Sequence, residues 1–387
     1  MSEHKGNDKK HSNINYWNLD LIKLKPGLVG SGSLHRSDAR GHEGTKGLTA
    51  LDFDPVGRLW VLTDRRNVLL SGRTSQSFVK KDHGQGDIHL ADIAIDNTKG
   101  RLIGLDVQGN RILSWRIGRI TEEEHLLEKC LAWDISAFKI EDNSRLAIWW
   151  DVSLGSVAYI TTPGKSGIWA LPLKEGASPN EVCLQGSSGK IAQLIGPISA
   201  ICIDQWFGSL LVFQTNHRQL VELPIDRAHT SVCESLVKWN NPPGHEPTWG
   251  TVNDLALFRT TDYVDTKYLL RNSYSEKGPR TLLVSDASRG RIDKLVQGSG
   301  HRAETIWRPL IGDGCAPARE SSMPRHPSAG DNLLDESIGT PMRLAVSHFD
   351  GRLAFLTEGS PYVKVLTPAT MRLTEETFSD SPRRYVT

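Results

Sequence analysis

Short apolar runs, separated by Gly, Asn, Asp and Pro, recur along nearly the whole chain. In LDFDPVGRLWVLTD (51–64), an apolar run leads to an aspartate, a glycine and a second apolar run. The segment LAVSHFDGRLAFLT (344–357) repeats this order with most of its residues changed. Runs rich in Val, Ile, Leu and Trp between turn-forming residues are typical of strands in successive hairpins. Long stretches with a helical period are nearly absent, so the pattern predicts an all-β protein.

Six copies of this pattern can be aligned on the residue that ends the first apolar run. These anchor residues are Asp54, Asp96, Asp151, Asp204, Phe258 and Ser347. In five copies a glycine follows within three or four residues: Gly57, Gly100, Gly155, Gly208 and Gly351. Aspartate can accept hydrogen bonds from its own turn, and glycine can take the positive φ that a tight turn requires. A third apolar run and a weaker fourth run then complete most copies.

Four strands in each of six units, at a spacing of about forty to fifty-five residues, predict a six-bladed β-propeller with four-stranded antiparallel blades. We expect the propeller to span residues 16–378, between a disordered polar segment at 1–15 and a tail at 379–387. Two long loops are expected at about 259–280 and 309–338. Ring closure requires an outer strand from one end of the chain, and both 16–24 and 371–378 are candidates.

The segment LTALDFDPVGRLWVLTD (48–64) resembles the repeats of six-bladed propellers of the low-density-lipoprotein-receptor class B (YWTD) type. It is equally similar to the NHL and SMP-30/gluconolactonase-like groups, and IAIDNTKGRLIGLD (93–106) fits the same pattern. The resemblance covers roughly residues 47–368, although no blade contains an intact Tyr-Trp-Thr-Asp. It implies a TolB-like propeller without selecting one of these families.

Composition and charge exclude several classes of protein. The net charge of +1 gives no overall attraction to nucleic acid, and no apolar stretch is long enough to span a membrane. The five cysteines are scattered without a CxxC pair, and no Asn-x-Ser/Thr acceptor is present. As written, the chain is expected to be a cytoplasmic, monomeric domain. An extracellular setting is expected if it is a fragment of a larger receptor.

The starts of the innermost strands are the first candidate site, because they face the central channel in a propeller of this type. Counting back four or five residues from each anchor gives mostly small or apolar residues. The exceptions are Asp92, Asn253, Asp254 and Arg343. Their carboxylate and amide oxygens could hold Ca²⁺ or another divalent cation. Alternatively, Arg343 and the aspartates form a buried polar network without a metal.

A second candidate is the segment HEPTWGTVNDLAL (245–257), which loosely resembles the Glu-x-Pro-x-Trp element of SMP-30-like lactonases. The resemblance implies that Glu246 is a metal ligand together with Asn253 and an aspartate. In such an enzyme the cation would polarise a carbonyl and activate water. The position of Glu246, directly before a proline and only seven residues before Asn253, argues instead for a loop between blades.

Two functions from different classes follow. The first is a non-catalytic recognition module that binds a protein or peptide on the propeller face, possibly as part of a YWTD-type receptor ectodomain. The second is a divalent-metal-dependent lactonase or esterase that uses Asp92, Asn253 and Asp254, with or without Glu246. Rigid blades with variable loops favour the first.

Overall fold

The computed structural model describes the strands and most of the tight turns of the chain. The described residues are 17–23, 47–71, 78–83, 88–117, 127–136, 138–151, 155–184, 196–205, 208–225, 231–232, 237–238, 249–259, 280–297, 305–314, 337–360 and 362–368. They contain strands and one short 3₁₀ helix, η2 (Ala287–Arg289), and no α-helix. The predicted N-terminal segment 1–15, the tail 379–387 and most of the loops at 259–280 and 309–338 lie outside these residues.

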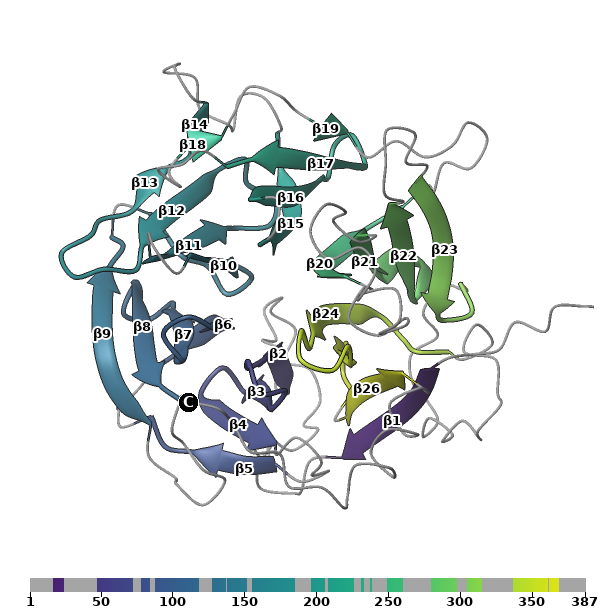
Figure 1. The fold of residues 1–387 in the computed structure, drawn as a ribbon, viewed down its shortest axis with the longest axis horizontal. Helices are drawn as coiled ribbons and strands as arrows, with labels where there is room; N and C mark the ends of the chain where they lie inside the picture. The colour runs from purple at the N-terminus through teal and green to yellow at the C-terminus, as the bar shows by residue number, and fades with distance from the viewer. Residues whose placement is uncertain are drawn as a thin grey trace, which may run out of the picture.

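The described strands form six four-stranded antiparallel sheets arranged as a ring (Figure 1), as the sequence predicts. Blade 1 contains β2 (Leu48–Phe53), β3 (Leu59–Thr63), β4 (Asn67–Ser71) and β5 (Phe78–Lys81). Blade 2 contains β6 (Leu90–Asp96), β7 (Arg101–Asp106), β8 (Arg111–Arg116) and β9 (Glu128–Asp134). Blade 3 contains β10 (Arg145–Asp151), β11 (Gly155–Thr161), β12 (Ile168–Pro172) and β13 (Asn180–Glu181).

The remaining three blades repeat this order. Blade 4 contains β15 (Ile198–Asp204), β16 (Ser209–Gln214), β17 (Gln219–Pro224) and β19 (Val237–Lys238). Blade 5 contains β20 (Val252–Arg259), β21 (Arg280–Asp286), β22 (Arg291–Gln297) and β23 (Thr305–Ile311). Blade 6 contains β24 (Pro341–Val346), β25 (Leu353–Thr357), β26 (Tyr362–Pro368) and β1 (Trp17–Lys23). A parallel pair, β14 (Cys183–Leu184) with β18 (Ser231–Val232), lies beside blades 3 and 4.

The ring is closed by a strand from the N-terminal part of the chain. Strand β1 pairs with β26 over seven residues, from Trp17 opposite Pro368 to Lys23 opposite Tyr362. Of the two segments that could supply this strand, 16–24 therefore does so, and 371–378 lies outside the described residues. Because β1 precedes blade 1 in the chain but pairs with β26 of blade 6, this pairing connects the first and last blades and closes the ring.

Each interface between neighbouring blades contains its own apolar cluster. Alternating residues of β3 show how one strand serves two interfaces: Trp60 and Leu62 pack toward blade 2, whereas Leu59 and Val61 pack toward blade 6. The same division recurs around the ring, so the inner strands are buried on both faces. The repeats therefore share the order of apolar and polar positions although their residues differ, since any apolar residue of suitable volume fills such an interface.

The turn after the inner strand of blade 1 has the chemistry that the repeat predicts. Asp54 Oδ1 accepts hydrogen bonds from the backbone N–H groups of Val56 and Arg58, at 3.1 and 2.9 Å. Its Oδ2 accepts from Arg58 Nε at 2.6 Å and from Trp60 Nε1 at 3.1 Å. All five predicted turn glycines have positive φ, between 57° and 90°. The turn aspartate therefore fixes both the hairpin and a buried tryptophan.

Candidate functional site

The inner strands of all six blades line one cavity along the axis of the ring. Its volume is about 160 Å³. Its lining combines apolar side chains, among them Ile93, Ile201 and Leu255, with polar groups that contribute the larger share of its surface. Asp92, Arg145, Asp254 and Arg343 line it near the starts of their strands. We call this charged part of the cavity, where the inner strands begin, the charged end.

Three aspartates of the cavity connect their own blade to the next one. Asp52 Oδ2 accepts a hydrogen bond from the backbone N–H of Ile95 at 2.7 Å. Asp92 Oδ2 accepts from Leu146 N–H at 3.0 Å. Asp254 Oδ2 accepts from Leu344 N–H at 2.9 Å, again across a blade interface. In each case Oδ1 accepts the N–H of the residue that follows the aspartate. These carboxylates therefore bind inner strands to one another.

Arg343 joins three blades at the charged end. Arg343 lies on β24 in blade 6, and its Nε donates to the carbonyl of Thr49 in blade 1, at 3.0 Å. Nη1 donates to Asp92 Oδ2 at 3.2 Å, and Nη2 to the carbonyl of Ala91 at 3.4 Å, both in blade 2. The ladders are irregular at these two carbonyls, between Leu48 and Ala50 and between Leu90 and Asp92. Arg343 thus satisfies carbonyl groups that such bulges leave without a ladder partner.

Arg145 has a different environment, although its side chain is also buried. It is the first residue of β10, whose pairing with β11 is regular, whereas the other five inner strands have a register shift near their start. Arg145 is 9% exposed, and its Nε has no hydrogen-bond partner. Within the described part of the chain, its guanidinium makes no side-chain hydrogen bond and no ion pair within 4 Å.

Burial changes the ionisation of the groups in the cavity. It raises the pKa of Asp52 to about 7, although two backbone amides favour the charged form. It also raises the pKa of Asp254, an effect that Arg343 and Arg145 oppose. Burial and, after it, the charge of Arg343 lower the pKa of Arg145 to about 10. At neutral pH Arg145, with its pKa of about 10, is therefore charged, and Asp52, with a pKa of about 7, is only partly ionised.

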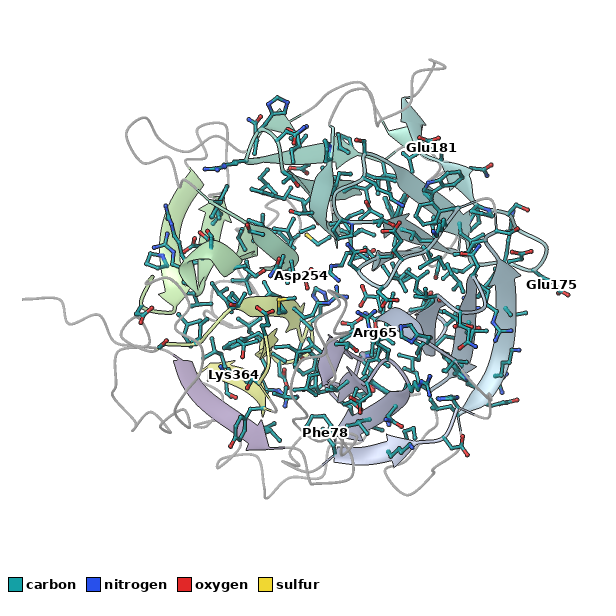
Figure 2. The ribbon with its side chains drawn as sticks, turned by 180° about the vertical axis from the view of Figure 1, so that it is seen from behind. Arg65, Phe78, Glu175, Glu181, Asp254 and Lys364 are labelled. Carbon is teal, nitrogen blue, oxygen red and sulfur yellow. The ribbon has the colours of Figure 1, made fainter. Side chains whose placement is uncertain are left out.

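Polar residues form a partly exposed rim around the charged end. Arg65 lies in the turn between β3 and β4, and its Nη1 is 3.7 Å from Asp142 Oδ1. His89 Nε2 is 3.1 Å from the same carboxylate oxygen. The side chain of Asp142 is 54% exposed, so the rim is open to solvent. Figure 2 shows Arg65 and Asp254 toward the centre of the ring, with Phe78 and Glu175 toward its edge.

The residues expected from sequence have distinct locations. Asp92, Asp254 and Arg343 line the cavity. Asn253 is not among the lining residues, and its Nδ2 donates to the carbonyl of Pro341 and approaches Met342 Sδ, both at 3.1 Å. Glu246 lies outside the described residues. Counting from the anchors missed Arg145, which lies six residues before Asp151, and Asp52, which lies two before Asp54. A charged residue at the start of the apolar run RLAIWW was the available signal for Arg145.

The described donors do not fit a divalent cation at the charged end. Both oxygens of Asp92 and of Asp254 already accept backbone N–H groups, and two charged guanidinium groups share the cavity. In the described ranges, no three His, Cys, Asp or Glu side chains are grouped as metal ligands. The expectation of Ca²⁺ or another divalent cation stays a prediction.

Comparison with solved structures shows a propeller of the same kind. An auxiliary nutrient binding protein from Bacteroides ovatus ATCC 8483 aligns with a TM-score of 0.54 and 11% identity, over 92% of this chain and 77% of that chain. A second, from Bacteroides thetaiotaomicron VPI-5482, has a TM-score of 0.52 and 10% identity, over 84% and 69%. The likeness shows the fold alone. No protein-family model and no curated protein matches the sequence.

These structures do not distinguish the YWTD, NHL and SMP-30-like groups from one another. Their identities to this chain, 11% and 10%, are too low to transfer a ligand. Among the described residues, no helix is long and apolar enough to cross a membrane.

Proposed function

We propose that this propeller is a non-catalytic recognition module that binds a protein or peptide ligand on the face that carries the charged end of the cavity. The observation that supports this proposal is the set of hydrogen bonds between blades at that end. Asp92, Asp254 and Arg343 are each held by partners from neighbouring blades. A site whose side chains are fixed before binding loses little conformational entropy when a ligand arrives.

The roles of the carboxylates favour binding over hydrolysis. A general base needs an oxygen free to accept a proton from substrate or water. Asp52, Asp92 and Asp254 instead use both oxygens to accept backbone N–H groups at 2.7–3.0 Å. Their replacement would first alter the packing of the inner strands. This is the behaviour of structural groups that shape a binding surface.

Selection from a random peptide library on the immobilised protein tests the proposal. Binding of the selected peptides would then be measured by fluorescence polarisation with two variants. Asp142→Lys reverses a 54% exposed charge on the rim of the charged end. Val56→Ser changes a residue that is 51% exposed in the turn after β2, on the opposite face.

We expect Asp142→Lys to change the affinity of the selected peptides at least threefold, and Val56→Ser to leave it unaltered. The proposal is wrong if no peptide binds saturably. It is also wrong if Val56→Ser weakens binding while Asp142→Lys does not.

A further inference from the structure

Arg145 carries a buried positive charge for which the described protein supplies no direct partner. Its side chain is 9% exposed, and its Nε makes no hydrogen bond. Isolated charges are costly to bury, and buried arginines are normally paired with carboxylates or carbonyl groups. Arg343, in the same cavity, follows this rule with three acceptors. Arg145 is therefore the exception that requires an explanation.

The neighbouring charges do not neutralise Arg145. Asp92 and Asp254 attract it, whereas Arg343 and Arg65 repel it. Both aspartates already accept backbone amides, and Asp92 also accepts Arg343. Neither carboxylate forms an ion pair with Arg145 within 4 Å. The described residues therefore supply no ion pair for this guanidinium, which leaves it open to a partner from elsewhere.

The cavity favours a carboxylate as that partner. Guanidinium is planar, and its N–H groups match the two oxygens of a carboxylate. The cavity, of about 160 Å³, has space for a group of a few heavy atoms, and apolar residues such as Ile148 and Ile201 line its wall. Most of the lining surface is polar, and Ile148 and Ile201 supply apolar contacts for only a short aliphatic stem behind the charged group. Asp92 and Asp254 disfavour a doubly charged anion such as phosphate in the same space.

We propose that Arg145 binds a carboxylate on a short aliphatic stem at the charged end of the cavity. This rests on the proposed recognition function and names the chemistry of its ligand. The carboxylate has three possible sources: an acidic side chain, a peptide C-terminus or a small carboxylic acid. All three present the same group to Arg145, and the experiment below separates them.

Calorimetric titration with butyrate tests this site directly, because butyrate is a carboxylate on a short stem. Butylamine and inorganic phosphate serve as probes of the opposite charge and of the other anion class. The variants are Arg145→Gln, Arg145→Lys and, as a matched control, Arg116→Gln, whose side chain is 62% exposed. Thermal melts of each variant verify that it is folded.

We expect saturable 1:1 binding of butyrate to the wild type and to Arg116→Gln. Affinity should fall at least tenfold in Arg145→Gln and partly recover in Arg145→Lys, because lysine restores the charge without the planar fork. Butylamine should not bind. The proposal is overturned if butyrate does not bind saturably, if Arg145→Gln binds it equally well, or if phosphate binds at this site more tightly than butyrate.

Short peptides then separate the sources of the carboxylate. One pair differs in a free or amidated C-terminus, and the other differs in an internal Glu or Gln. A preference for the free C-terminus or for Glu that is lost in Arg145→Gln identifies a peptide source, and binding of butyrate alone identifies a small acid. Failure of the carboxylate site remains distinguishable from failure of the recognition function, because library peptides could still bind the rim in a manner independent of Arg145.

Discussion

Arg343 in blade 6 donates to Asp92 in blade 2, with 3.2 Å between Nη1 and Oδ2, and thereby passes over the inner strand of blade 1. Its other donors bond to backbone carbonyls of blades 1 and 2. Arg145 is buried in the same cavity and makes no such bonds. The two arginines thus differ: Arg343 is held by groups of neighbouring blades, whereas Arg145 has no direct partner among the described residues.

Because only Arg343 has direct partners, we expect substitutions of Arg343 and Arg145 to change the free energy of unfolding by different amounts. Arg343→Met should lower the free energy of unfolding by about 2–4 kcal/mol, since it removes the ion pair of Asp92 and the side-chain donor to two backbone carbonyl groups. Arg145→Met should change it by less than about 1 kcal/mol or raise it, since it removes a buried charge that lacks a direct partner. Urea denaturation of both variants measures the difference. Equal losses in the two variants would contradict this expectation.

The pH dependence of stability should include a contribution from Asp52. Its pKa is raised to about 7 in the folded protein, against about 4 in an unfolded chain, so the folded state holds an extra proton between these values. The stabilisation is complete below about pH 4, is lost as the pH rises toward 7, and does not change further above that. Because Asp52 is only partly buried, solvent screening limits the effect to about 1–2 kcal/mol.

The control for this prediction is Asp52→Asn, which does not titrate. At low pH the amide should behave much as the protonated carboxyl does, because its NH₂ group, like a carboxyl O–H, does not accept from Phe53 or Ile95. Unfolding curves between pH 4.5 and 8.5 should therefore show a smaller decline in the variant than in the wild type. The raised pKa of Asp254 adds a decline of the same sign to both proteins. Parallel curves for the two proteins would rule out a role for Asp52.

Alanine substitutions at two turn glycines should distinguish the cost of backbone strain from the cost of a steric clash. Gly208 has φ +67°, and a Cβ there would lie 2.5 Å from the ring of Trp149. Gly155 has φ +90°, with nothing within 4 Å of the added carbon. We expect Gly208→Ala to destabilise by about 2 kcal/mol or more, and Gly155→Ala by about 1 kcal/mol from strain alone. Thermal melts should rank the two variants in this order, and the reverse order would exclude the contact with Trp149 as the cause.

Removal of β1 should open the ring. A chain that begins after Lys23 lacks the strand that pairs with β26, so it leaves an unpaired edge in blade 6. We expect its melting temperature to fall by several degrees. A synthetic peptide WNLDLIK, added in excess, should restore part of the loss, whereas a scrambled peptide should not. An unchanged melting temperature after truncation would show that the ring does not depend on this strand.

The fold could be predicted from sequence because the repeated residues form hairpins through contacts with their own neighbours in the chain. The turn pair Asp54 and Gly57, for example, specifies a hairpin without any distant partner. The outer strand of blade 6 could not be chosen from sequence, since its pairing joins Trp17 to Pro368 across nearly the whole chain. Apolar alternation alone made 16–24 and 371–378 equally suitable.

The candidate site was harder to predict, because it depends on how each inner strand begins. A fixed count from the anchors assumes the same register in every blade, and this assumption found Asp92, Asp254 and Arg343. The register of β10 is regular where the other inner strands shift, so the count passed over Arg145. Whether a buried arginine has a partner depends on three-dimensional contacts, which the sequence does not contain.

The most direct test of this account is an NMR titration with butyrate of protein that contains ¹⁵N-labelled arginine. It measures the chemical shifts and the solvent exchange of the Nε–H signals of Arg145 and Arg343. The losses of single signals in Arg145→Gln and Arg343→Lys assign them. The account predicts that the Arg343 signal exchanges slowly with solvent and stays in place when butyrate is added, because Nε donates to Thr49. The Arg145 signal should shift until butyrate saturates the site. A butyrate-dependent shift of Arg343 with Arg145 unchanged, or no shift of either signal, would contradict it.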